Sequence, residues 1–296
     1  MASLIEVKNR IISVKSTRQI TSAMKMVASA KLHKAQGRIE NMLPYQRKLN
    51  EILINFLSTD VTVRSPYTAM RPVRKVAIVA FSSNTSLCGS YNANVAKRLE
   101  ETLAKYRELG RENILIYPIG KKIEEAVGKM GYEPCGSFQT MAEKPSYHEA
   151  YVLANVLMQH FVAKRIDRVE LIYHHFKSMG TQQLLNESYL PIDLTAVMRE
   201  AAASVGENPR MYNNDYIIEP SEEELIAQLL PKVLSQKIFT VLLDATASEH
   251  AARTLAMQTA TDNANELIQE LTKQYNKSRQ QAITNELLDI IGGSLK

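Results

Sequence analysis

The sequence lacks the features that mark secreted, disulfide-linked or membrane-spanning proteins. Of its 296 residues only Cys88 and Cys135 are cysteines, and they do not have the CxxC spacing of a redox or metal site. No run of about 18 apolar residues occurs, which argues against a membrane-spanning helix. The first residues, MASLIEVKNR, lack the apolar stretch and cleavage site of a signal peptide. We therefore expect an intracellular protein with free thiols.

Motifs of catalysis and of nucleotide binding are also absent from the sequence. Neither GxGxxG nor GxxxxGK[ST] follows the apolar run at residues 76–81, and no HExxH or GxSxG motif occurs. His174 and His175 are adjacent, so in a strand they point to opposite faces and cannot hold one metal together. The sequence thus predicts no catalytic residue, no cofactor and no metal. A degenerate nucleotide-binding enzyme is the weakest alternative.

Charge is distributed unevenly along the chain. Residues 1–50 hold ten Lys and Arg but only Glu6 and Glu40, a net charge of +8, so the remainder carries −3 of the total of +5. A basic helix is compatible with a solvated face, with an acidic protein partner or with a nucleic-acid backbone. A basic coiled-coil protein that binds nucleic acid is therefore the main alternative to the function given below.

Residues 4–56 predict one long helix. Apolar residues recur at steps of three and four, as in the heptad pattern of a coiled coil. We expect two phase slips, near Arg18 and Lys31, because the apolar positions fall into three groups: Leu4, Val7, Ile11 and Val14; Ile20, Met24 and Val27; Leu32, Ala35, Ile39 and Met42.

Residues 221–291 predict a second long helix. Ser221 and Glu224 form a capping-box signature at its start, and Gly292 with Gly293 is expected to end it. Neither terminal helix has a domain of its own to pack on, so each is expected to pack on the other. Small residues would allow close approach at two patches: Ala23, Ala28, Ala30 and Ala35 on the first helix, and Ala245, Ala247, Ala251, Ala252, Ala256, Ala260 and Ala264 on the second.

The middle of the chain alternates between apolar strands and helices. Strands are predicted at residues 76–81, 114–119 and 169–173, and helices at 92–109, 121–130 and 147–163. Unbroken apolar strands predict a mostly parallel sheet covered on both faces, and residues 182–190 before Pro191 predict a strand at its edge. The fold class is α/β: an antiparallel coiled coil of the terminal helices (residues 1–58 and 210–296) with a central Rossmann-like domain (residues 73–200).

The two terminal helices are unequal in length. If they start level, some 20 residues at the C-terminus, or roughly 30 Å of helix, project without a partner. An exposed apolar end on a soluble protein usually marks a binding site. The projecting end combines polar residues with a cluster of apolar ones: Ile283, Leu287, Leu288, Ile290 and Ile291.

Two segments of the chain carry a specific family resemblance. Residues 17–28 read TRQITSAMKMVA, and residues 275–287 read YNKSRQQAITNEL after the small-residue stretch at 248–264. These segments resemble the signatures of the gamma subunits of F-type ATP synthases. The turn at residues 83–90, SNTSLCGS, departs from the family's SDRGLCGG-like pattern.

The resemblance implies a non-catalytic central rotor stalk. Such a subunit turns inside a ring of three alpha and three beta subunits and couples proton flow through the membrane c-ring to the catalytic sites of the beta subunits. The lack of a transit peptide and of a Cys-bearing regulatory insertion points to a bacterium. The expected location is the cytoplasmic face of the inner membrane, as a peripheral protein.

The resemblance also assigns residues to partner contacts. Met24, Lys25 and Arg253 match positions level with the acidic lever loops of the beta subunits, and Arg279, Gln280 and Thr284 match positions higher in the ring. The segment around Tyr216 and Glu219, with the central domain, is expected to form a foot on the epsilon subunit and the c-ring.

Overall fold

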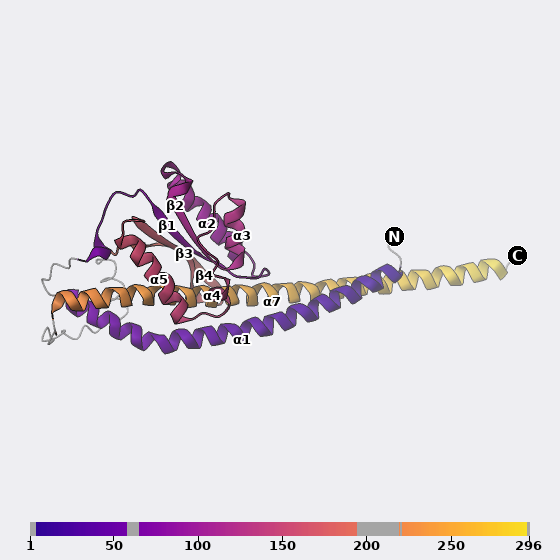
Figure 1. Ribbon diagram of the computed structural model, residues 1–296. Coiled ribbons are helices and arrows are strands. Elements are labelled where there is room, and N and C mark those ends of the chain that lie inside the picture. The colour runs from indigo at the N-terminus through magenta and orange to yellow at the C-terminus, as the bar shows by residue number, and fades with distance from the viewer. Residues whose placement is uncertain (1–3, 58–64, 194–218, 220, 295–296) are drawn as a thin grey trace. The chain divides into compact units, whose positions relative to one another are not determined.

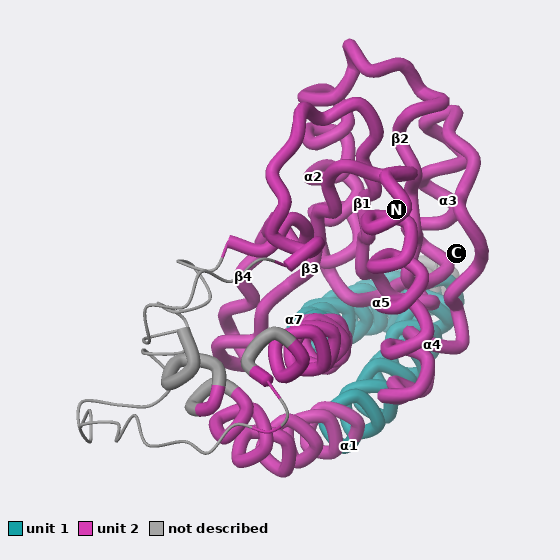
Figure 2. The backbone as a smooth tube through the Cα atoms, turned by 60° about the vertical axis from the view of Figure 1, so that its left-hand side comes forward, with its two compact units in different colours: residues 1–30, 253–296 teal, residues 31–252 magenta. Residues whose placement is uncertain are grey.

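The computed structural model describes residues 4–57, 65–193, 219 and 221–294. The chain divides into two compact units, one of residues 1–30 and 253–296 and one of residues 31–252 (Figure 2). The elements are α1 (Leu4–Leu57), η1 (Pro66–Thr68), β1 (Val76–Phe81), α2 (Tyr91–Lys105), η2 (Arg107–Leu109), η3 (Arg111–Asn113), β2 (Ile114–Ile119), α3 (Lys121–Lys129), α4 (Gln139–Glu143), α5 (Tyr147–Val162), β3 (Arg168–Ser178), β4 (Thr181–Leu190) and α7 (Glu222–Ser294).

The sheet has the expected mostly parallel arrangement. Its strand order is β2-β1-β3-β4, with β1 parallel to both β2 and β3. The last strand, β4, runs antiparallel to β3 at the edge, as the sequence before Pro191 predicts. Strand β3 is longer than expected, because its hairpin with β4 continues the ladder to Ser178. His174 and His175 therefore lie within the strand and not at its end.

Helices cover both faces of the sheet, which confirms the predicted layers (Figure 1). Because strand side chains alternate between faces, Val76 and Ile78 of β1 pack with α2 and α3, around buried Val95, Leu99 and Ile123. On the opposite face, residues of β1 and β3 pack with α5 and the first part of α7 in a larger cluster that includes Ala77, Val79, Phe81, Leu157, Phe161, Leu171, Leu234 and Ile238.

The first part of α7 is a core helix of the α/β unit. Leu230, Leu234, Ile238 and Val241 are at most 4% exposed and belong to the same cluster as the sheet. The expectation that the terminal helices have only each other to pack on is therefore wrong for this part of α7. Part of the helix is apolar enough to cross a membrane by length and composition alone, but half of that window is buried inside the protein.

The two ends of α7 compare differently with expectation. At the start, the Ser221 side-chain oxygen accepts a hydrogen bond from the Glu224 N–H over 3.3 Å, as the capping signature predicts. At the other end the helix passes through Gly292 and Gly293 to Ser294, so the expected stop is wrong. Glycine ends a helix when it adopts a left-handed conformation, but it also accepts helical dihedrals.

The buried face of α1 follows one unbroken heptad, so the predicted phase slips are wrong. Ile20 and Val27, which the apolar pattern places in the seam, are 60% and 58% exposed. The seam continues instead through polar residues, because the helix keeps its period whatever side chains occupy it. Its two rows of buried or half-buried positions are Val7, Val14, Thr21, Ala28, Ala35, Met42 and Leu49, and Ile11, Arg18, Lys25, Leu32, Ile39 and Gln46.

The small-residue patches are confirmed in part. Ala35 packs with Ala247 and Ala251 in a cluster completed by Leu32, and Ala28 and Ala264 are also buried. Ala23 and Ala30 are exposed, because they lie outside the two rows of seam positions. The small side chains of those two residues therefore do not serve helix packing within the chain.

Candidate functional site

In the unit of residues 1–30 and 253–296, α1 and α7 form an antiparallel pair. The hydroxyl oxygens of Thr21 and Thr261 lie 2.8 Å apart. One turn away, Arg18 Nη1 donates to Asn265 Oδ1 over 3.4 Å. Residue numbers rise on one helix as they fall on the other, which confirms the predicted antiparallel coiled coil.

The middle of this paired segment has a polar seam. Arg18, Thr21 and Lys25 occupy successive seam positions of α1, where an apolar residue would pack more strongly. Buried polar pairs in coiled coils specify register rather than add stability. The apolar pattern does not indicate Arg18 and Thr21 as contact residues, because both are polar. The heptad extended from Ile11 and Val14 includes both.

Met24, Lys25 and Arg253 all fall within this unit. Met24 and Lys25 are half-buried on α1, one turn after Thr21. Arg253 lies on α7 two turns before Thr261, and its side chain is buried, with 8% exposed. The three residues therefore lie within a few turns of the polar seam.

The end of α7 extends beyond the first residue of α1. Continued along both helices, the register set by Thr21 and Thr261 places Leu4 opposite Ser278. Arg279, Gln280 and Thr284 lie past that point and are exposed; the Thr284 hydroxyl donates to the carbonyl of Gln280 on its own helix, at 2.9 Å.

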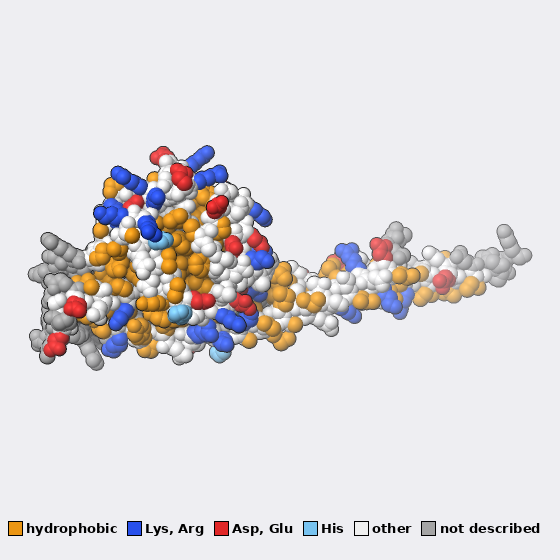
Figure 3. All heavy atoms as spheres, in the orientation of Figure 1, with side chains coloured by type: hydrophobic (Ala, Val, Ile, Leu, Met, Phe, Trp, Pro, Cys, Tyr) orange, Lys and Arg blue, Asp and Glu red, His pale blue; other side chains and the backbone are white. Residues whose placement is uncertain are grey.

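Apolar side chains on this end are exposed, as predicted. Figure 3 shows hydrophobic side chains at the surface along this end of α7. The exposed fractions of the apolar side chains range from 48% to 68% for Ile283, Leu287, Leu288, Ile290 and Ile291. A helix end of this composition is suited to a surrounding partner that is partly apolar.

Of the two residues predicted for the foot, the structure describes one. Tyr216 lies outside the described residues, and Glu219 is exposed in a bend before α7. Its exposed carboxylate is available to a partner.

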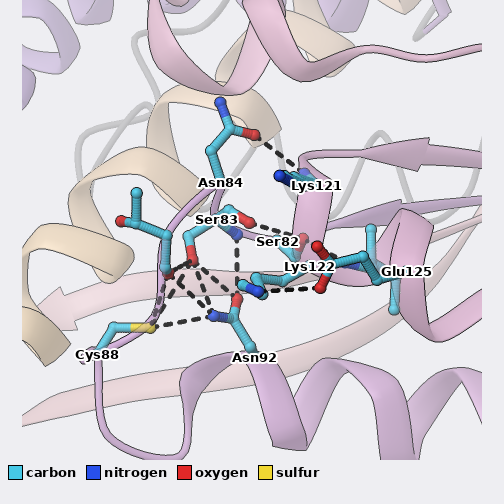
Figure 4. Close-up of polar contacts among 10 residues, drawn as sticks. Ser82, Ser83, Asn84, Cys88, Asn92, Lys121, Lys122 and Glu125 are labelled. Carbon is cyan, nitrogen blue, oxygen red and sulfur yellow. Dashed lines mark hydrogen bonds and ion pairs between the residues drawn. The ribbon is translucent and has the colours of Figure 1, made fainter.

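The turn after β1 is a closed hydrogen-bond network (Figure 4). Ser82 Oγ accepts from the N–H of Ile123, and Asn84 Oδ1 accepts from the N–H of Lys121, so both cap the start of α3. Asn92 donates to Ser83 Oγ over 2.8 Å and tightens the turn. The amides of Ser83, Lys121 and Ile123 are bonded to side chains of the turn and of α2, which favours a structural turn over a nucleotide site.

His174 and His175 have separate surroundings, as strand alternation predicts. The His174 ring is buried and stacks on Tyr91 with 4.5 Å between ring centres, and burial lowers its pKa to about 4. His175 on the other face approaches Asp244 of α7, with 2.7 Å between Nδ1 and Oδ2. Within the described part of the chain no group of three His, Cys, Asp or Glu could hold a metal.

Comparison with known proteins covers the whole chain. A family model described as "ATP synthase" matches residues 3–295. The chain is 71% identical over 295 residues to the "ATP synthase gamma chain" of Bacteroides fragilis and 68% identical over 298 residues to that of Bacteroides thetaiotaomicron, with each alignment covering 100% of both proteins.

A solved structure has a similar fold. A chain from a structure of the Euglena gracilis mitochondrial ATP synthase, containing OSCP, F1 and the c-ring, aligns with a TM-score of 0.65 at 21% identity. The alignment covers 98% of this chain and 92% of that one. At this identity the likeness concerns the fold, with its long terminal helices and central sheet.

Proposed function

The chain belongs to the ATP synthase gamma chain family, and we propose on that basis that it is the central rotor of an F-type ATP synthase. It turns inside a ring of three alpha and three beta subunits. It couples proton flow through the membrane c-ring to the catalytic sites of the beta subunits. The chain is itself non-catalytic, and its task is to present different surfaces to those subunits in turn.

The observation that carries the proposal is the unpaired end of α7. Its apolar side chains are largely exposed where the structure describes them, and Leu287 and Leu288 are more than half exposed. Full burial of a leucine or isoleucine side chain contributes about 1.5–3 kcal/mol. A sleeve of surrounding subunits would bury several such side chains together while leaving the helix free to turn about its axis.

A rotor must have unlike faces to drive its neighbours through unlike states. A ligand shifts a conformational equilibrium only as far as it binds the two states differently. The paired segment meets this requirement, because α1 exposes basic Lys8 and Lys15 while α7 exposes acidic Asp262, Glu266 and Glu270. Each orientation then offers a given beta subunit a different surface, favouring its open or its closed state.

Two sets of residues are proposed to contact the ring. Met24, Lys25 and Arg253 face the acidic lever loops of the beta subunits, where the excess positive charge of residues 1–50 is favourable. Their position beside the polar seam supports this, because Arg18 and Lys25 of that seam carry positive charge. Arg279, Gln280 and Thr284, exposed on the unpaired end of α7, contact the ring further along the helix.

The remaining contacts are proposed for the foot of the rotor. Tyr216, Glu219 and the α/β domain bind the epsilon subunit and the c-ring, which hold the chain peripherally on the cytoplasmic face of the bacterial inner membrane. Three segments of the chain divide these roles. Residues 1–58 and 210–296 form the shaft of the rotor, and residues 73–200 form the globular part of the foot.

Co-expression with the alpha and beta subunits of the same organism tests the proposal. With the chain present we expect a stable assembly whose ATP hydrolysis is much faster than that of alpha and beta alone. Equal hydrolysis with and without the chain, or no co-purification, would contradict the proposal. Steeply salt-dependent DNA binding by the chain, without affinity for alpha and beta, would favour the nucleic-acid alternative.

A further inference from the structure

The β3–β4 hairpin is joined to α7 by polar contacts that the proposed rotor function does not use. The His175 ring nitrogen Nδ1 lies 2.7 Å from Asp244 Oδ2. The Asp244 side chain is 11% exposed and that of His175 is 42% exposed, so the pair sits at the boundary between core and solvent. A charged pair with one buried carboxylate is stronger than a fully exposed one.

Other contacts fix the same turn of α7 without depending on pH near neutrality. Ser248 Oγ donates to the carbonyl of His174 over 3.0 Å, and the Tyr91 hydroxyl donates to the carbonyl of Ala245 over 2.9 Å. A second ion pair joins Lys237 of α7 to Glu187 of β4 at 3.0 Å. Among these contacts, the histidine contact is the one whose charge changes in the physiological pH range.

We propose that His175 and Asp244 form a proton-dependent clamp that fixes the β3–β4 hairpin to α7 and loosens as the surroundings become alkaline. When the imidazole is protonated, the hydrogen bond joins a cation and an anion. When the imidazole is neutral, the attraction between full charges is lost and a weaker hydrogen bond remains. The clamp lies in the α/β unit and is a property of the chain that does not depend on its proposed rotor function.

The electrostatic surroundings of His175 favour the protonated form. The hydrogen bond to Asp244 raises the pKa of His175 above its ordinary 6.5, against an opposing effect of burial, and nearby Glu187 of β4 raises the pKa further. Lys177 on the same strand opposes it. The contribution of the clamp is therefore fully present below about pH 6.5 and is lost as the pH rises through the raised pKa.

Titration of the full-length chain tests the clamp. Histidine resonances are followed by NMR between pH 5 and 9 in the wild type and in Asp244→Asn, with His175→Gln used to assign the signal. Hydrogen exchange of the hairpin amides is measured over the same range and corrected for the intrinsic rate. We expect the pKa of His175 to lie above 6.5 and to fall in Asp244→Asn. As the pH rises through the pKa of His175, the hairpin amides should lose protection against exchange. The loss should be about tenfold for each unit by which that pKa exceeds 6.5.

His148→Gln, which changes an exposed histidine on α5, is the matched control and should leave the exchange profile unchanged. In His175→Gln the pH-dependent step in hairpin exchange should disappear while the hairpin stays folded. The proposed clamp is contradicted if the pKa of His175 lies at or below 6.5. It is also contradicted if the pH-dependent step in hairpin exchange persists in either Asp244→Asn or His175→Gln. These results concern the chain alone, so they stand whether or not the rotor assembly forms.

Discussion

Thr21 of α1 and Thr261 of α7 bring their hydroxyl oxygens to 2.8 Å across a coiled-coil seam. Each hydroxyl also lies near a carbonyl of its own helix, Thr21 to Arg18 at 3.1 Å and Thr261 to Met257 at 2.7 Å. The pair thus links two helices at one position, so a shift of either helix along the other breaks the contact. It sets the register that leaves the end of α7 unpaired.

The threonine pair should show measurable coupling. We expect a double-mutant cycle of Thr21→Val and Thr261→Val, measured by urea unfolding of the full chain, to give a coupling free energy of roughly 0.5–1.5 kcal/mol. Thr259→Val is the matched control, because Thr259 also bonds the carbonyl four residues back but is exposed. A cycle of Thr21 and Thr259 should show no coupling. Equal coupling in both cycles would contradict a specific pair.

His174 should make the folded chain sensitive to acid. Its pKa is about 4 in the folded chain, against 6.5 for an ordinary histidine, because burial disfavours the charged ring. The unfolded chain therefore binds more protons between these values, so stability falls as the pH drops from about 6.5 toward 4, by up to roughly 3 kcal/mol.

A comparison of His174→Phe with the wild type isolates this effect. Phenylalanine keeps a ring beside Tyr91 and cannot titrate, so the difference in unfolding free energy between the two proteins should change with pH only in this window. Thermal unfolding at several pH values measures it. A constant difference from pH 4 to 8 would show that His174 is not buried as a neutral ring.

Exposed and buried leucines of α7 should respond differently to the same substitution. Leu287→Ser with Leu288→Ser should leave the melting temperature of the isolated chain unchanged, because both side chains are exposed, but should lower the yield of assembly with alpha and beta severalfold. Leu271→Ser is the control on the paired part of α7. Leu271 is 3% exposed, and its replacement should destabilise the chain by about 2–5 kcal/mol. Normal assembly of the double variant would argue against the proposal that surrounding subunits bury this end of α7.

Met24→Lys should weaken coupling without preventing assembly. The substitution adds a positive charge beside Lys25, at the proposed level of the acidic lever loops. In membrane vesicles we expect ATP hydrolysis to persist while proton pumping per ATP falls. Met70→Lys adds the same charge at an exposed position before β1 and should leave pumping unchanged. Unchanged pumping in Met24→Lys would count against the placement of Met24.

Local patterns in the sequence predict much of the fold. The strands at residues 76–81 and 114–119 are found with the expected bounds, because a continuous apolar run flanked by polar residues or glycine defines a buried parallel strand. The start of α7 is likewise predicted by Ser221 and Glu224. In these cases the residues that form the sequence pattern lie within a few positions of the strand or helix start that they predict.

Features that depend on distant partners could not be predicted in this way. The seam position of Thr21 was missed because nearby Ile20 is more apolar, although Ile20 faces outward. The packing of Leu234 and Ile238 against the sheet looks, in sequence, the same as packing against α1. Asp244 was the one acid within an apolar stretch of α7, but only the fold identifies His175 as its partner.

Direct observation of rotation is the decisive measurement. The beta subunits are fixed to a surface, and a bead is attached at Met179→Cys, an exposed site at the β3–β4 turn, with Cys135 replaced by serine. On addition of ATP we predict that the bead turns in one direction, in three steps per revolution because the proposed ring has three beta subunits. An assembly that hydrolyses ATP while the bead stays still would contradict the rotor function.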